Sequence, residues 1–208
     1  MSEAQVDIRG FWQWFADHHL EILEIMGGRR DGKVTEMIDD ALSRHGLSIT
    51  YEVTEGRFGG EITFTPCGDP VAASFIDRFV AEAPTFDTWV IYSRRQRKSL
   101  QSALAFVKAV HGIDISDAHF QVRSREGVYH LRFLHDGLLR LGEDARFAVV
   151  ATFLDHALGE AVAMNFIGGI DFQPSAEGIE MALMINQLIS HTGEMAPAGT
   201  DDIPRATG

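Results

Sequence analysis

The residues best suited to chemistry lie on a predicted hairpin that spans residues 118–134. If this hairpin turns at its central Glu-Gly pair, Arg123 faces His130, because each strand residue has one partner directly opposite. In the same register, Gln121 faces Arg132. These four side chains point to one side of the hairpin. There they either face solvent or bind an anion or a partner peptide.

A run of cations, Arg94–Lys98, is the second candidate for anion binding. It directly precedes a helix that we expect to begin near Ser99, where the helix dipole favours negative charge. Either acidic side chains neutralise the run within the fold, or the run meets an anionic ligand. Arg94 is expected at the end of a strand. It joins the hairpin cations as a candidate ligand-binding residue if the hairpins lie beside that strand.

Cys67 is the one cysteine in the chain of 208 residues. It lies just before an expected helix, whose unpaired N-terminal amides stabilise a thiolate. Adding 69, the spacing of an internal repeat, carries Cys67 onto Asp136 and Pro66 onto His135. The sequence therefore allows a catalytic candidate, a Cys–His–Asp arrangement of Cys67, His135 and Asp136, although a lone cysteine near a turn is more often inert.

Two pairs of residues invite a metal-binding interpretation. His18 and His19 are adjacent on an expected helix, so their side chains point about 100° apart and cannot share one ion. His156 and Glu160 lie four positions apart on another expected helix, and we interpret them as a surface pair. Because two ligands do not complete a site, the sequence predicts neither a metal nor a cofactor.

The elements that position these residues follow an internal repeat. Adding 69 carries Tyr51 onto Phe120, and apolar residues alternate with polar ones through both copies of the hairpin. Such alternation is typical of half-buried strands. In the expected third strand of each copy, Ile91 corresponds to Met164 at a spacing of 73. The pattern predicts a tandem duplication, with convergent patterning as the alternative.

The predicted fold is α+β, with two tandem α-β-β-α-β units, antiparallel hairpins, helices mainly on one sheet face, and a helix at each end. The expected strands are the hairpins 48–65 and 118–134 and the single strands 89–93 and 162–166. The expected helices are 7–26, 34–44, one that begins at Pro70 and ends at Ala83-Pro84, 99–110, 144–158 and 176–191. The expected divisions are an N-terminal helix (1–30), the units 31–96 and 97–174, a C-terminal helix (175–193) and a disordered tail (194–208), with one shared domain as the alternative.

Composition limits the classes of function. The chain has 30 acidic and 18 basic residues, a net charge of −12, and 45% hydrophobic residues, enough for a core. The negative charge disfavours nucleic-acid and acidic membrane surfaces and is compatible with a basic protein partner. The chain lacks both a long apolar run and the pattern of a signal peptide, so we expect a cytoplasmic protein. A single cysteine excludes an internal disulfide.

Aromatic residues gather near the N-terminus. Phe11, Trp12, Trp14 and Phe15 fall within five positions of the first expected helix. A group of this size is too large to leave in water, so it packs on the sheet or forms a contact surface. The second alternative makes these four residues the interface of a homo-oligomer.

Three motifs are similar to those of a group of bacterial proteins of unknown function. They are Phe11-Trp12-x-Trp14-Phe15, Ala83-Pro84 followed by Trp89, and Leu158-Gly159-Glu160 followed by Gly169-Ile170-Asp171-Phe172. The resemblance covers about residues 10–174 and implies a bacterial origin and a mixed α+β fold. It transfers no function.

Two classes of function fit these observations. The first is a non-catalytic cytoplasmic binding protein, such as an acidic inhibitor or an immunity-type partner of a basic protein. The second is a small hydrolase or transferase that acts on an anionic substrate, through the polar side of the 118–134 hairpin or through Cys67 with His135. Since no catalytic motif is complete, the sequence favours the first.

Overall fold

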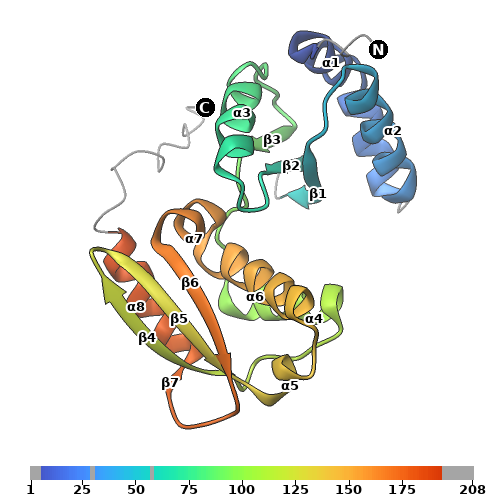
Figure 1. Cartoon of the computed structure of the whole chain (residues 1–208). Coiled ribbons are helices and arrows are strands. Elements are labelled where there is room, and N and C mark those ends of the chain that lie inside the picture. Colours follow the sequence, from blue (N-terminus) through green and yellow to red (C-terminus); the bar gives the residue numbers. More distant parts are fainter. Residues whose placement is uncertain (1–5, 29–30, 57–58, 194–208) are drawn as a thin grey trace, which may run out of the picture. The chain divides into compact units, whose positions relative to one another are not determined.

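The computed structural model describes residues 6–28, 31–56 and 59–193 (Figure 1). The fold is α+β, as predicted, and contains two small mixed sheets. The chain divides into two compact units, Met1–Gln96 and Arg97–Gly208. Each unit has its own sheet and its own hydrophobic core.

The first unit packs helices against a three-stranded sheet in the order β1-β2-β3. Its elements are α1 (Ile8–Gly27), α2 (Asp31–Arg44), β1 (Thr50–Gly56), β2 (Gly59–Thr65), α3 (Pro70–Ala81) and β3 (Trp89–Tyr92). β1 and β2 form an antiparallel hairpin. The chain then passes through α3 and returns as β3, parallel to β2.

Local sequence signals set the ends of the first helices. Asp7 caps α1 by accepting a hydrogen bond from the backbone N–H of Gly10. Asp69 caps α3, and Pro70 follows in the first turn. The missing N–H of proline costs nothing there, because the first N–H groups of a helix have no partner within it. α2 begins at Asp31, three residues earlier than the predicted start.

The core of the first unit is built on the N-terminal aromatic cluster. Phe11 and Phe15 are fully buried, and Trp12 is 3% exposed. Trp12 also donates from Nε1 to the carbonyl of Phe79 at 2.7 Å. Phe11, Trp12 and Phe15 therefore pack in the core, whereas Trp14 is partly exposed. An interface between copies would have to use Trp14 without them, and the oligomeric state stays a prediction that solution mass measures.

The second unit packs helices against a four-stranded sheet in the order β6-β5-β4-β7. Its elements are α4 (Leu100–His111), β4 (His119–Arg125), β5 (Val128–Leu134), α5 (Asp136–Leu139), α6 (Glu143–Leu158), α7 (Glu160–Phe166), β6 (Ile167–Gln173), β7 (Ile179–Glu180) and α8 (Met181–Gly193). β4 and β5 are antiparallel, β6 is parallel to β5, and β7 is antiparallel to β4. The buried Phe120, Leu131 and Phe133 mark the face that the helices cover.

The two units follow the same path through a hairpin, a crossover helix and a parallel third strand. Ile62 pairs with Ile91 in the first sheet, and Leu131 pairs with Ile170 in the second. Since a shift of 69 carries Ile62 onto Leu131, the residue equivalent to Ile91 is Ile170. The predicted equivalence of Ile91 with Met164 is wrong, because the second unit inserts α7 before its third strand.

The strand predicted at 162–166 is wrong for the same reason. Gly159, with a φ of 88°, bends the chain between α6 and α7, and burial then recurs at Glu160 and Ala163, which is helical spacing. His156 and Glu160 are both fully buried on different helices, so the predicted surface pair is also wrong. No single described helix is long and apolar enough to cross a membrane; α6 with α7 meets the length and composition, but the pair is bent by 113°.

The C-terminal helix begins later than predicted. Ile179 and Glu180 form β7 beside β4, and α8 starts at Met181. Pairing with the edge of β4 satisfies the backbone groups of residues 179–180, so this distant contact overrides their helical spacing. The predicted disordered tail, 194–208, lies outside the described residues.

Candidate anion-binding face of the second sheet

The outer face of the second sheet carries the polar residues of the hairpin. Arg123 pairs with His130 and Gln121 pairs with Arg132, which confirms the predicted register. The turn is the pair Glu126-Gly127, with φ angles of 56° and 80°. Two residues in the left-handed region match the twist of the flanking strands, so this turn fixes which side chains share a face.

Arg132 is positioned by two neighbours on this face. Its Nη1 donates to Oε1 of Gln121 at 3.2 Å, and its Nη2 lies 3.5 Å from a carboxylate oxygen of Asp171 on β6. The side chain is 25% exposed, and its buried Nε has no hydrogen-bond partner among the described residues. A guanidinium carries five N–H donors. Arg132 is therefore held in a fixed position, and its Nη atoms keep further N–H groups that can donate to a ligand.

His130 lies over a glycine pair at the start of β6. A Cβ atom at Gly169 would come 2.5 Å from Nδ1 of His130, and one at Gly168 would come 2.3 Å from Val128. The pairing of β5 with β6 shifts register between Tyr129 and His130, as at a bulge. Glycine at both positions therefore leaves the room that the exposed imidazole of His130 occupies.

These side chains line an open cavity of about 400 Å³. Its lining residues are Gln121, Arg123, Ser124, Arg125, His130, Leu131, Arg132 and Asp171. The lining carries three guanidinium groups and one carboxylate, and Glu126 of the turn lies 3.6 Å from Arg125, so the cavity keeps an excess of positive charge in a chain whose net charge is −12. Because a guanidinium can donate two parallel hydrogen bonds to a carboxylate or a phosphate, the cavity is suited to an anion.

Asp171, Gly168 and Gly169 belong to this face, although the sequence analysis did not select them as site residues. Their place depends on the pairing of β6 with β5, two strands separated by a crossover. The one local signal was the Gly-Gly pair itself, since adjacent glycines in a strand indicate a bulge or a close approach.

Arg94 does not belong to this cavity. It follows β3 in the first unit and forms an ion pair with Asp77 at 2.9 Å. The adjacent Arg95 pairs with Glu52 on the outer face of the first sheet at 2.7 Å. For these two cations the alternative of neutralisation within the fold is confirmed. The placement of Arg94 as a ligand-binding residue has no support in its described contacts.

Cys67 is an exposed residue in the turn between β2 and α3. Its φ is 52°, and its backbone N–H donates to Oγ1 of Thr65 at 3.1 Å. The turn belongs to the first unit, whereas His135 and Asp136 belong to the second. The described contacts therefore do not bring the three proposed catalytic residues together.

His135 and Asp136 both have structural roles. Nδ1 of His135 accepts a hydrogen bond from the N–H of Leu138 at the start of α5, and Nε2 lies 3.1 Å from a carboxylate oxygen of Asp117. The carboxylate of Asp136 accepts from the N–H of Ser175 at 3.0 Å, and this backbone hydrogen bond lowers the pKa of Asp136. Both imidazole nitrogens are engaged, so His135 is not arranged as a general base for a thiol.

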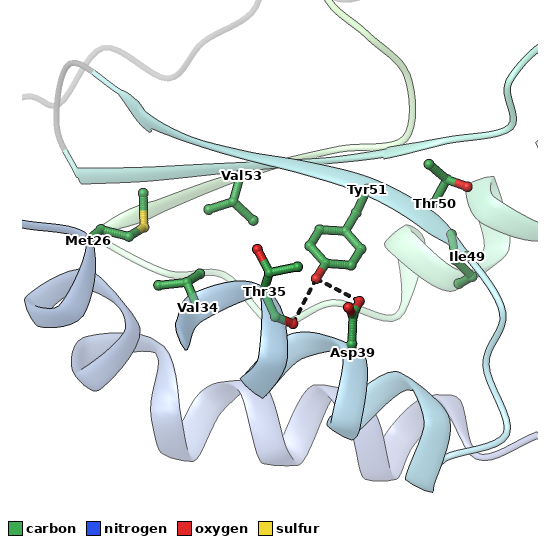
Figure 2. Close-up of a pocket in the computed structure, with 8 residues that line it drawn as sticks. All are labelled: Met26, Val34, Thr35, Asp39, Ile49, Thr50, Tyr51 and Val53. Atoms are coloured by element: carbon green, nitrogen blue, oxygen red, sulfur yellow. Dashed lines mark hydrogen bonds between the residues drawn. The ribbon is translucent and has the colours of Figure 1, made fainter. Parts of the chain in front are cut away.

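A second cavity, of about 440 Å³, lies between α2 and the edge strand β1 (Figure 2). Its lining residues are Met26, Val34, Thr35, Asp39, Ile49, Thr50, Tyr51 and Val53. Tyr51 points into it and donates its hydroxyl to Oδ1 of Asp39 at 2.8 Å and to the carbonyl of Thr35 at 3.1 Å (Figure 2). Burial, and then the hydrogen bond to Asp39, raise the pKa of Tyr51 well above its usual range. This cavity could not be predicted from the sequence, because it depends on how α2 packs on β1.

The described ranges contain no cluster of three or more His, Cys, Asp or Glu side chains that could hold a metal ion. His18 and His19 each place Nδ1 2.8 Å from a carbonyl of their own helix, of Trp14 and Ala16 respectively. These two imidazoles therefore take part in local hydrogen bonds within α1.

Comparison of the chain with protein-family models, with curated proteins and with solved structures finds no match. The resemblance to the bacterial group stays a prediction. The function is therefore inferred from the side chains on the outer face of the second sheet.

Proposed function

We propose that this protein is a non-catalytic binding protein whose second sheet holds an anionic group of its ligand. The observation that carries the proposal is the meeting of Arg123, His130 and Arg132 around one open cavity. An overall charge of −12 repels anions in general, so cations gathered in one place favour a local contact with a negative group.

The chemistry of the cavity selects a carboxylate or a phosphate. Arg132 is held by Gln121 and Asp171, so little side-chain entropy is lost when it binds. Arg123 and His130 are exposed on the adjacent strands and add donors on the same side. A hydrogen bond to a charged group contributes about 1.5–3 kcal/mol, so each guanidinium contact accounts for roughly tenfold or more in affinity.

Binding fits this cavity better than catalysis on an anionic substrate. Of the lining residues, Ser124 carries the one hydroxyl, and in the hairpin it stands opposite Tyr129 rather than opposite His130. A hydrolase or transferase needs a nucleophile within hydrogen-bond reach of its base. An anion needs only the donors that Arg123 and Arg132 supply.

We extend the proposal to a cytoplasmic setting, in which the chain acts as an acidic inhibitor or immunity-type partner of a basic protein. The support is the excess of acidic residues, 30 against 18 basic. Opposite charges on two proteins speed their association and restrict the choice of partner more than they raise affinity.

The experiment is an NMR titration of the ¹⁵N-labelled protein with inorganic phosphate and with succinate. We expect shifts at the amides around Arg123, His130 and Arg132. Arg123→Gln and Arg132→Gln should each weaken binding about tenfold, because each removes a charged donor. The matched control is Arg140→Gln, which removes an exposed arginine of the same unit that does not line the cavity.

Two results would contradict the proposal. The first is the absence of localised shifts with either anion. The second is an equal loss of affinity in Arg140→Gln, which would mean that only general charge attracts the anion. Turnover of a phosphate ester that Arg132→Gln abolishes would favour the catalytic alternative instead.

A further inference from the structure

The outer edge of β1 is available for pairing. Within the described part of the chain, β1 pairs with β2 and with no other strand. On the free edge of such a strand, backbone N–H and C=O groups point away from the sheet and can pair with another extended segment. Any segment that adds there extends the sheet by main-chain hydrogen bonds.

The second unit shows what lies at the equivalent edge. β4, the counterpart of β1, pairs with β5 on one side and with β7 on the other. β7 runs antiparallel to β4 and places Ile179 opposite Phe120. The residue equivalent to Phe120 is Tyr51, and the described residues of the first unit provide no strand beside it. The internal repeat therefore supplies a template for an added antiparallel strand.

The side chains at the two edges differ as this template predicts. Phe120 is fully buried, and Ile179 packs against the core of the second unit. Tyr51 is partly buried and borders the cavity of about 440 Å³, together with Val53 on the same strand and Ile49 just before it (Figure 2). The volume is within the range of about 300–1,000 Å³ that is usual for ligand pockets. The cavity has apolar room where a neighbouring strand would direct a side chain.

The charge at this edge favours a basic partner. Among the residues that line the cavity, Asp39 alone is charged. Its carboxylate accepts the hydroxyl of Tyr51 at 2.8 Å, and the side chain is exposed (Figure 2). A lysine or arginine two positions from the aliphatic residue lies on the same face of the added strand and would meet opposite charge here.

We infer that the free edge of β1 binds an extended segment of a basic partner protein. The segment adds antiparallel to β1, directs an aliphatic side chain into the cavity beside Tyr51, and places a basic side chain near Asp39. The inference rests on the proposed association with a basic protein and goes beyond the anion-binding face, since it gives the class of partner and the way it is held. It uses the first unit, whereas the anion-binding face belongs to the second.

The first test uses a short synthetic peptide with the repeat Ile-Thr-Lys-Thr, in which isoleucine and lysine stand two positions apart and therefore point to the same face of the added strand. Hydrogen exchange of the full chain, followed by mass spectrometry, should show slower exchange in Thr50–Gly56 when the peptide is added. The reason is that amides on the free edge become hydrogen-bonded. A peptide in which serine replaces isoleucine should give no protection, because it leaves the cavity unfilled.

Two variants on α2 test the contact with Asp39. Asp39→Asn keeps an acceptor for Tyr51 and removes the charge, so the affinity for the lysine peptide should fall about fivefold to tenfold. Asp40→Asn is the matched control, since Asp40 is exposed on the same helix but does not line the cavity. Arg123→Gln should bind the peptide as the natural chain does, which separates this inference from the anion-binding face.

Several outcomes would overturn the inference. One is unchanged exchange in Thr50–Gly56 at saturating peptide. Another is an equal loss in Asp39→Asn and Asp40→Asn, because binding would then follow general charge. A third is protection of the same segment without peptide that rises with protein concentration, which would assign the edge to a second copy of the chain.

Discussion

Gly169 lets His130 take its position on the anion-binding face of the second sheet, because the missing side chain of Gly169 leaves the space that His130 fills. A Cβ atom at this position would lie 2.5 Å from Nδ1 of His130. We expect Gly169→Ala to push the imidazole from its place and to weaken phosphate binding about tenfold, with fold stability lowered by about 1 kcal/mol. Titration of the variant by NMR measures the first effect, and urea unfolding measures the second.

The control for this prediction is Gly27→Ala at the end of α1. A Cβ atom at Gly27 meets no heavy atom within 4 Å, so this substitution should leave phosphate binding unchanged. If Gly169→Ala bound phosphate as tightly as the natural chain, the position of His130 would not matter for binding.

Asp136 gives the stability of the second unit a dependence on pH. The N–H of Ser175 donates to its carboxylate and lowers the pKa of Asp136 in the folded state. The unfolded chain titrates near the usual aspartate value of about 3.9. Since the folded pKa is the lower one, the carboxylate stabilises the fold above that value, and this contribution is lost as the pH falls toward the folded pKa.

Asp136→Asn should therefore flatten the loss of stability in acid. The amide keeps an acceptor oxygen for Ser175 but does not titrate, so the free energy of unfolding should fall less between about pH 5 and about pH 3 than in the natural chain. Urea unfolding at several pH values measures the change. Glu177→Gln, which removes an exposed carboxylate from the loop that contains Ser175, is the control. If this variant flattened the slope equally, the hydrogen bond to Asp136 would not be the cause.

Among the helices and strands, the sequence predicted those whose formation depends on residues close together in the chain. The register of the second hairpin followed from its alternation and its Glu-Gly turn, both local signals. The strand predicted at 162–166 failed because apolar residues at alternate positions also occur along α7. What decides between the two is the bend at Gly159 and the packing of Ala163, and both depend on tertiary contacts.

The bend between α6 and α7 depends on the backbone of Gly159. Its φ of 88° and ψ of 137° lie in a region that residues with a Cβ rarely adopt. We expect Gly159→Ala to destabilise the second unit by about 1–3 kcal/mol. The matched control is Gly142→Ala at the start of α6, where φ is −60° and a Cβ is unopposed, with a cost of about 0.5 kcal/mol. Equal unfolding midpoints for the two variants would mean that the bend relaxes without strain.

At the scale of the molecule, two copies of one plan have acquired different surfaces. On the outer face of the first sheet, Glu52 and Glu61 occupy the positions that Gln121 and His130 occupy in the second. The second copy also adds β7 at the edge that the first copy leaves free. The charge difference can be read from the sequence alone, once Glu52 and Glu61 are matched to Gln121 and His130 through the repeat. The sequence did not show the free edge, because that depends on where residues 179–180 pair.

Because the two cores are separate, we predict that each unit unfolds independently of the other. One core uses residues between 8 and 91 and the other uses residues between 100 and 189. All three tryptophans, Trp12, Trp14 and Trp89, belong to the first unit, so tryptophan fluorescence reports on that unit alone. The fragment 97–193, which lacks tryptophan, should therefore keep a cooperative thermal transition by circular dichroism.

In the full chain, Trp12→Phe loses the hydrogen bond to Phe79 and should lower the midpoint of the fluorescence transition. The circular-dichroism transition of the second unit should keep its midpoint. A fragment that unfolds without a transition would mean that the second core needs the first, and the two units would then be one folding domain.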